Sequence, residues 1–110
     1  MTDLTRLPAS VLRGQIAAKK ISPVELTDAV LARADKLQPV LNCFITIVAD
    51  QARAAAKQAE DAVMQGKPLG LLHGIPFAAK DLVNTAGVRT TFGSLHHDDN
   101  VPKEDAVCAG

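Results

Sequence analysis

The sequence predicts an α/β fold in which helices pack on a sheet. Three segments repeat apolar residues at the 3.6-residue period of a helix, and two short runs of apolar and β-branched residues have the length of buried strands. These elements follow one another as helix, helix, strand, helix and strand, an order that favours a layer of helices on a sheet. Two strands are too few to close that sheet, so we expect the fold to be incomplete in this chain.

The first predicted helix covers residues 7–20. Leu12 and Ile16 are four residues apart and therefore share one face. Pro8 suits an early helical position, and two lysines near the end complement the negative carboxyl end of the helix dipole. We expect the shared face to be buried.

The second predicted helix has a strong start signal. Ser22 can act as the N-cap, with Pro23 at the first helical position and Glu25 at the third, which together form a capping box. The apolar residues that follow recur on one face as far as Leu37. We expect the helix to run from about Pro23 to Leu37 and to be ended by Pro39.

The first predicted strand and the third predicted helix come next. Cys43–Val48 is dominated by β-branched and aromatic residues, so we expect a buried strand in which Cys43 is a small core residue. Asp50 can cap a helix over Gln51–Gln65, which carries a narrow stripe of alanines. Gly66 suits the position just past the end of this helix.

The second predicted strand leads to a charged pair. Ile75–Ala79 is an apolar run between a glycine and the polar residues Lys80 and Asp81, within a strand region over residues 71–81. Side chains alternate along a strand, so Lys80 and Asp81 should point to opposite faces. Val83–Arg89 should contain a hairpin or an irregular return around Gly87.

Composition excludes several classes of function. Twelve basic and twelve acidic side chains balance, so charge alone draws the chain neither to nucleic acid nor to an anionic membrane. No apolar run approaches the roughly 20 residues needed to span a bilayer. Cys43 and Cys108 lack any paired spacing, and no signal peptide is recognisable, so we expect a cytoplasmic protein.

Lys80 is the residue on which a catalytic hypothesis can rest. A lysine that acts as a base must be neutral, and moving a lysine pKa from about 10.4 to near 7 means disfavouring the ammonium by roughly 4 to 5 kcal/mol. Burial or a nearby positive charge can do this, whereas an adjacent carboxylate would oppose it. The alternative from pattern alone is a lysine at a strand end that carries its charge into solvent.

A family resemblance favours the catalytic alternative. The runs Leu72–Asp81 and Asn84–Ser94 resemble the first catalytic segment of the amidase signature family. Ser22–Leu26 and Val101–Val107 resemble further stretches of the same family in the same order. The resemblance is gapless over the first two runs and covers nearly the whole chain.

The resemblance implies a fold, a mechanism and partners. The fold would be the N-terminal part of an α/β/α amidase signature fold, with helices packed on a mixed sheet. Lys80 would be the base of a Ser-cisSer-Lys triad that hydrolyses a carboxylic amide through an acyl-enzyme, without metal or organic cofactor. The partners implied are a small-molecule amide, and either a second copy of the chain in a homodimer or the other subunits of an amidotransferase.

The sequence also departs from that family. The Gly/Ser-rich segment that carries the two catalytic serines does not occur in these 110 residues. We therefore expect residues 1–110 to be a truncated N-terminal portion, with residues 1–70 as a helical lead-in and residues 71–94 as the segment carrying Lys80. Two alternatives stay open: the glutaminase subunit of a tRNA-dependent amidotransferase, and an inactive fragment or interaction piece.

Other polar residues in and near the run Leu72–Asp81, which we call the motif, favour structural roles. The run from His96 to Asp99 contains ligand-type side chains, but adjacent residues rarely converge on one ion, so a polar turn is the better interpretation. His73 has no obvious nucleophile to serve and should be a hydrogen-bonded loop residue. Ser94 lacks the flanking glycines of a nucleophile elbow and should be scaffolding. Asp81, facing away from the lysine, should anchor backbone or hydroxyl groups of the Thr90–Ser94 loop.

Overall fold

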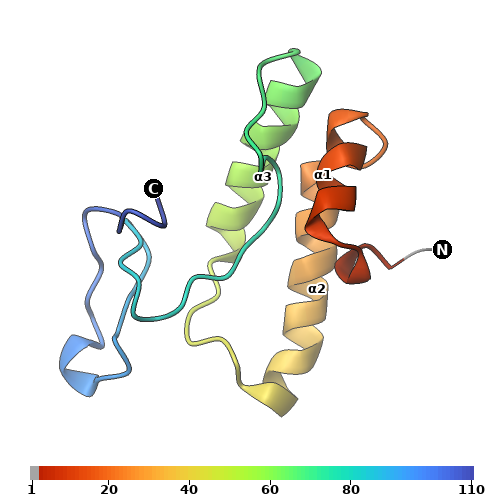
Figure 1. Cartoon of the computed structure of the whole chain (residues 1–110). Coiled ribbons are helices and arrows are strands. Elements are labelled where there is room, and N and C mark those ends of the chain that lie inside the picture. The colour runs from red at the N-terminus through yellow and green to blue at the C-terminus, as the bar shows by residue number, and fades with distance from the viewer. Residues whose placement is uncertain (1–2) are drawn as a thin grey trace. The chain divides into compact units, whose positions relative to one another are not determined.

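A computed structural model describes residues 3–110 of the chain (Figure 1). Its elements are, in order, η1 (Leu4–Arg6), α1 (Ala9–Ala17), α2 (Pro23–Leu41), α3 (Ala49–Met64) and η2 (Leu95–His97). The chain divides into two compact units: a helical unit, which extends to Cys43 and includes Ala49–Pro76, and a C-terminal unit made of Phe44–Val48 and Phe77–Gly110. No helix within residues 3–110 is long and apolar enough to cross a membrane.

The helical unit holds the apolar core of the chain. In Figure 1, α2 and α3 run antiparallel to each other. Leu12 and Ile16 from α1, Leu26 from α2 and Val63 from α3 form one buried cluster. Three helices that each bury a narrow apolar stripe can therefore share a single core, as amphipathic patterning requires.

The structure confirms the first helix with shorter bounds than predicted. Leu12 and Ile16 are 6% and 0% exposed, so the predicted face is the buried one. Pro8 lies at the N-cap rather than inside the helix. The helix ends at Ala17, and Lys19 takes a left-handed conformation with φ +59°. The two predicted terminal lysines therefore lie beyond the helix.

The start of α2 is as predicted, but its end is not. The Ser22 hydroxyl accepts hydrogen bonds from the N–H groups of Val24 (3.0 Å) and Glu25 (3.4 Å), which is the expected cap. Pro39 does not end the helix, because the helix continues to Leu41. Proline sits there in the last turn, where its missing N–H removes one hydrogen bond and few later bonds depend on it.

The third helix is confirmed with its boundaries shifted. It begins at Ala49, so Asp50 lies in the first turn and is not the predicted cap. Its end is as expected: Gly66 has φ +70°, the Gly66 N–H donates to the carbonyl of Val63 (3.2 Å), and the Lys67 N–H donates to that of Ala62 (3.1 Å). This double closure is the arrangement that favours glycine past a helix end.

Both predicted strands are wrong for this chain. Neither Cys43–Val48 nor Ile75–Ala79 forms a strand, and no strand occurs anywhere in residues 3–110. Cys43 is exposed instead of being a core residue. A strand is stable only when neighbouring strands pair with it and its faces are covered, and residues 3–110 supply neither. The expected mixed sheet is therefore absent from the described part of the chain.

The nearest approach to a sheet lies in the C-terminal unit. Two of its segments run antiparallel and exchange three backbone hydrogen bonds, namely Thr90 N–H to Asn100 O (2.9 Å), Gly87 N–H to Pro102 O (3.0 Å) and Ala106 N–H to Asn84 O (2.8 Å). The predicted return around Gly87 is confirmed: Gly87 has φ +72°, and the Val88 N–H donates to the Thr85 carbonyl at 3.0 Å. The pairing is too sparse to make a regular ladder.

Candidate functional site

Lys80 lies in the C-terminal unit on a segment without helix or strand, and its side chain is exposed. Its carbonyl accepts a hydrogen bond from the Val83 N–H at 2.8 Å, which turns the chain directly after the motif. Within residues 3–110 its Nζ takes part in no hydrogen bond and no ion pair. The amine is therefore free to meet a group that these residues do not supply.

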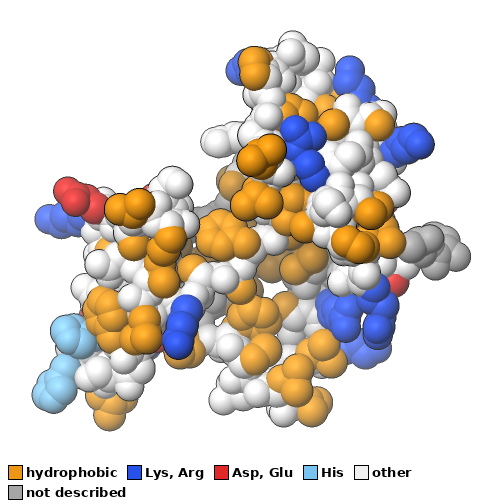
Figure 2. All heavy atoms as spheres, in the orientation of Figure 1, with side chains coloured by type: hydrophobic (Ala, Val, Ile, Leu, Met, Phe, Trp, Pro, Cys, Tyr) orange, Lys and Arg blue, Asp and Glu red, His pale blue; other side chains and the backbone are white. Residues whose placement is uncertain are grey.

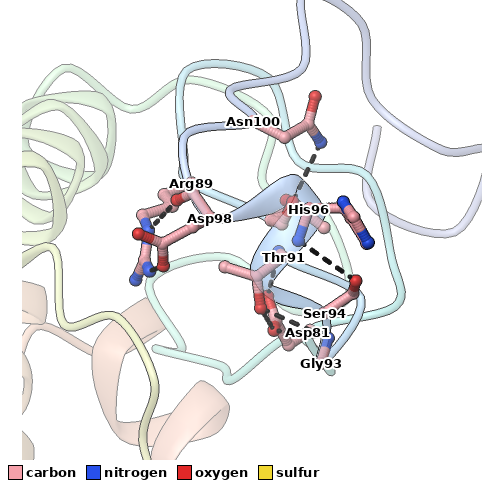
Figure 3. A network of polar contacts seen from close by, with 9 residues as sticks. Asp81, Arg89, Thr91, Gly93, Ser94, His96, Asp98 and Asn100 are labelled. Carbon is pink, nitrogen blue, oxygen red and sulfur yellow. Dashed lines mark hydrogen bonds and ion pairs between the residues drawn. The ribbon is translucent and has the colours of Figure 1, made fainter.

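Asp81 holds the loop that follows the motif. Its carboxylate accepts hydrogen bonds from the Thr91 N–H (2.7 Å), from the Thr91 hydroxyl and from the Gly93 N–H (3.4 Å). Its carbonyl accepts a further bond from the Phe92 N–H at 2.9 Å. Figure 3 shows Thr91 and Gly93 gathered at this carboxylate. The predicted contact between Asp81 and the backbone and hydroxyl groups of the loop is thus confirmed; we call it the Asp81 clamp.

The clamp fixes the charge on Asp81. The hydrogen bond from the Thr91 hydroxyl, followed by that from the Thr91 N–H, lowers the pKa of the Asp81 carboxyl below its usual value, because both bonds favour the ionised form. Thr90 and Thr91 are only 2% and 5% exposed, so the hydroxyl that meets Asp81 is shielded from water. The Asp81 carboxylate is therefore bound to this loop and forms no ion pair with Lys80.

The clamped loop has an uncommon backbone conformation. Phe92 and Gly93 both have positive φ, at +54° and +68°. A phenylalanine in the left-handed region is disfavoured by contact between its Cβ and the carbonyl oxygen. The bonds that Asp81 makes to Thr91, Phe92 and Gly93 span this region of the loop, so the clamp offsets the local cost.

Ser94 is structural, as expected. Its hydroxyl caps η2 by accepting a hydrogen bond from the His96 N–H at 3.3 Å, and its own N–H donates to the Thr91 carbonyl at 3.0 Å. The residue therefore ends the clamped loop and starts the short helix.

His96 and His97 are exposed on η2, while the carboxylate of Asp98 is engaged elsewhere. Arg89 donates one hydrogen bond from Nε to the Asp98 carbonyl and a second from Nη2 to the Asp98 carboxylate. The His97 ring meets the Phe92 ring edge-on, with centroids 5.2 Å apart. Residues 3–110 contain no group of three histidine, cysteine or acidic side chains placed to hold a metal ion.

The sequence analysis did not predict two further polar contacts around the Thr90–Ser94 loop. The Asn100 side-chain amide donates to the Thr90 carbonyl at 2.9 Å, and Arg89 reaches Asp98 across nine residues. Neither pair lies at a helical or strand period, so no periodic signal could have identified it. Abundant polar residues near the motif were the only hint.

The start of the motif is anchored on the helical unit. His73 Nε2 lies 2.8 Å from the Ala59 carbonyl oxygen, which confirms its role as a hydrogen-bonded loop residue. A carbonyl oxygen only accepts, so Nε2 carries the proton in this contact. Ile75 packs against the buried cluster, and Arg13 Nε donates to the Gly70 carbonyl at 2.9 Å.

Gly74 allows the chain to approach the helices closely. It has φ +78°, and a Cβ added there would lie 3.0 Å from Pro23 Cγ and 3.2 Å from Ile16 Cδ1. Both neighbours are fully buried. Glycine is thus required at this position for two independent reasons, backbone conformation and space.

A shallow hollow of about 410 Å³ lies in the C-terminal unit, among Asn84, Phe92, His97, Asn100 and Pro102 and the two charged residues that follow. Lys80 does not line it. The hollow is therefore no substrate pocket for a reaction at the Lys80 amine.

Comparison with known proteins identifies the family. The family described as Amidase matches residues 25–109, which include the whole motif and the Asp81 clamp. The chain therefore belongs to the amidase family. The sequence resemblance to amidases is confirmed.

Individual relatives agree with this assignment. The chain is 44% identical over 94 residues to the A subunit of the glutamyl-tRNA(Gln) amidotransferase of Chloroflexus aurantiacus, covering 86% of this chain and 19% of that protein. It is 38% identical over 106 residues to an amidase of Pseudomonas putida, covering 96% of this chain and 22% of that protein. The chain thus spans about a fifth of the length of these curated relatives.

A solved structure also shares the fold. It belongs to a vestigial protein complex that reveals the evolutionary origins of an s-triazine catabolic enzyme. The TM-score is 0.86 at 26% identity, and the match covers 92% of this chain and 22% of that chain. The arrangement of helices and loops described above is therefore shared with the corresponding part of a larger protein.

Proposed function

We propose that this chain supplies the lysine base of an amidase that cleaves a carboxylic amide through a Ser-cisSer-Lys triad. In this proposal the neutral amine of Lys80 takes a proton from a bridging serine, which in turn deprotonates the nucleophilic serine. Both serines and the N–H groups that hold the oxyanion come from polypeptide beyond these residues. The leaving group is ammonia or an amine.

One observation carries the proposal: the family match includes Lys80, and the carboxylate of the next residue, Asp81, is bonded to the buried Thr91. The clamp occupies the Asp81 carboxylate with Thr91 and Gly93, so the nearest carboxylate in sequence is bound to a partner other than the amine. Lys80 is left without a partner among residues 3–110, as a base awaiting its serine should be.

The test uses an enzyme that contains this chain in place of the segment it matches. In this chimera, residues 1–110 replace the matched segment of the Pseudomonas putida amidase, which is 38% identical over 106 residues. We expect the chimera to release ammonia from simple amides and a Lys80→Met variant to lose about 100-fold to 10,000-fold in kcat/KM, the range of general-base catalysis. Lys67→Met, at another exposed lysine, is the matched control and should keep the activity. A Lys80→Met chimera within twofold of the parent chimera would refute the role.

A second candidate is the glutaminase subunit of a tRNA-dependent amidotransferase. The relative from Chloroflexus aurantiacus, at 44% identity, favours it because its name describes one subunit of such an enzyme. Both candidates use the same amide chemistry and the same lysine. They differ in substrate: glutamine as the preferred amide, together with dependence on partner subunits, would favour the amidotransferase, whereas equal use of simple amides without partners would favour the amidase.

A candidate of another class is an inactive fragment or interaction piece. It is favoured by the short match, which spans 19% of one relative and 22% of another. We expect the isolated chain to release no ammonia from glutamine or simple amides. Turnover by the isolated chain at enzyme-like rates would contradict both this expectation and the assignment of the serines to other polypeptide.

A further inference from the structure

The C-terminal unit is held together by polar contacts and not by an apolar core. Among residues 3–110, the buried residues that fall in this unit are Thr90 and Thr91, whereas the apolar core lies in the helical unit. Its large apolar side chains are exposed, including Phe77 (73%) and Leu95 (92%). Figure 2 shows apolar side chains over the face of this unit turned to the viewer, near the histidines. The backbone geometry of this unit therefore depends on hydrogen bonds, and those of the two threonines are shielded from water.

The two buried threonines are bonded to different groups. The Thr90 hydroxyl donates to the Val88 carbonyl at 3.1 Å, two residues back in the chain, so it closes only a local turn. The Thr91 N–H (2.7 Å) and the Thr91 hydroxyl both donate to the carboxylate of Asp81, ten residues back. Of the two side chains, it is therefore that of Thr91 that ties the loop to the residue after Lys80.

The backbone beside Lys80 is held at three points. The Lys80 carbonyl accepts a hydrogen bond from the Val83 N–H at 2.8 Å, and the Asp81 carbonyl accepts one from the Phe92 N–H at 2.9 Å. The third point is the Asp81 carboxylate, through Thr91. The side chain of Lys80 is exposed, so this backbone sets where its flexible four-carbon stem begins.

We propose that Thr91 is a positioning residue for the Lys80 base. It acts through Asp81, whose bound carboxylate fixes the backbone from which the lysine stem leaves. This inference rests on the proposed function, in which the amine must come within hydrogen-bond reach of a serine. A displacement of about 1 Å in such a contact can cost about 100-fold in rate. Without the Thr91 hydroxyl, the carboxylate oxygen that it meets keeps only the Gly93 N–H at 3.4 Å.

The test compares two isosteric substitutions in the chimera defined above. Thr91→Val removes the hydroxyl that bonds Asp81, and Thr90→Val removes a hydroxyl at the adjacent, equally buried residue. We expect Thr91→Val to lose about 10-fold to 100-fold in kcat with little change in KM, because a misplaced amine impairs proton transfer and not substrate binding. Thr90→Val is the matched control and should stay within about twofold of the parent in both. Thr91→Ser keeps the hydroxyl and should recover kcat to within about threefold of the parent.

A second measurement follows the backbone without any reaction. In the 110-residue chain, hydrogen exchange at the Val83 and Phe92 amides reports on the two bonds that hold the carbonyls of Lys80 and Asp81. Thr91→Val should speed exchange at both amides by about 10-fold or more, and the control variant should not.

Asp81→Asn breaks the same contact from the other side, because its amide nitrogen cannot accept the Thr91 hydroxyl. It should reproduce the loss in kcat and takes the place of Thr91→Val if that variant does not fold. A Thr91→Val chimera with the kcat of the parent would overturn the proposal. So would an equal loss in Thr90→Val, a loss confined to KM, or unchanged exchange at the two amides. Faster exchange in Thr91→Val, together with a chimera that stays active as Lys80→Met or hydrolyses no amide, would refute the proposed function and leave Thr91 as the residue that fixes this backbone.

Discussion

A methyl group added at Gly74 tests whether the motif is anchored on the helices as described. The Cβ of Gly74→Ala would lie 3.0 Å from Pro23 Cγ and 3.2 Å from Ile16 Cδ1, and the backbone there has φ +78°. Neither neighbour can move into open space, because Ile16 is 0% exposed and Pro23 is also fully buried.

The expected cost can be worked from these two effects. A non-glycine residue in the left-handed region costs about 1 to 2 kcal/mol. Forcing an extra methyl into a packed site costs about 1 to 3 kcal/mol. The reduced entropy of the unfolded chain offsets about 0.4 to 1 kcal/mol of this sum. The net loss in the free energy of unfolding should therefore be about 1 to 4.5 kcal/mol.

Gly14→Ala provides a control of opposite sign. Gly14 lies inside α1, its backbone is helical, and an added Cβ would meet no atom within 4 Å. Alanine should therefore stabilise the helix by about 0.5 to 1 kcal/mol. Urea unfolding followed by circular dichroism at a helical wavelength measures both variants.

Two results would refute this reasoning. One is a Gly74→Ala protein within about 0.5 kcal/mol of the parent, which would mean that the motif does not lie against Pro23 and Ile16. The other is an equal loss in Gly14→Ala, which would mean that any added methyl is damaging. A Gly74→Ala chain that is unfolded without urea agrees with the prediction, provided that Gly14→Ala remains folded.

Three further predictions concern the clamp, a helix cap and the cysteines. Because the clamp lowers the pKa of Asp81 in the folded state, its contribution is present above the unfolded pKa of about 3.9 and is lost as pH falls through the lowered value. The protection of the Thr91 amide, measured as its hydrogen exchange relative to the intrinsic rate at each pH, should therefore fall below about pH 4 in the parent. In Asp81→Asn the Thr91 amide should be less protected at every pH and its protection should not change through this range, whereas a protection profile like that of the parent would contradict the clamp. Ser22→Ala should lose about 1 to 2 kcal/mol in urea unfolding, since it removes the cap of α2, and a loss below about 0.3 kcal/mol would count against the cap. Cys43 and Cys108 are both exposed, so both thiols should react with a soluble disulfide reagent without denaturant, and a slow Cys43 would favour the buried position expected from the sequence.

Local signals in the sequence were sufficient to predict the helices. The Ser22 cap, the four-residue spacing of Leu12 and Ile16, and Gly66 past the end of α3 act within a turn or two of chain, and each is in place in the structure. Pro39 was wrongly expected to end the helix, because the effect of a proline depends on its position. In the last turn of a helix it removes only one backbone hydrogen bond.

Strands could not be predicted in the same way, because they depend on partners. Ile75–Ala79 has the composition of a buried strand, but no strand within residues 3–110 pairs with it. The contact between Asp81 and the Thr90–Ser94 loop was nonetheless predicted correctly, although the strand on which that expectation rested does not form within residues 3–110. The link between Arg89 and Asp98 crosses nine residues without any period and could be found only in the structure.

The hypothesis that Lys80 is the catalytic base came from family resemblance, since its residue type and setting alone also fit a solvent-exposed lysine. The structure adds the clamp beside it and an amine without a partner among residues 3–110. The two sources are therefore complementary. The resemblance suggests the reaction, and the structure shows which groups bind the Asp81 carboxylate next to the lysine.

The most direct test of the central claim restores an amine at position 80. A Lys80→Cys chimera should be inactive, and treatment with 2-bromoethylamine converts the thiol to a lysine analogue one sulfur atom different from the original. We predict that aminoethylation raises kcat/KM by about 100-fold or more, while the same treatment of the inactive Lys80→Met chimera, in which Cys43 and Cys108 are modified equally, gives no gain. A Lys80→Cys chimera that is active before treatment, or that gains nothing after it, would contradict the claim that the amine of Lys80 is the base.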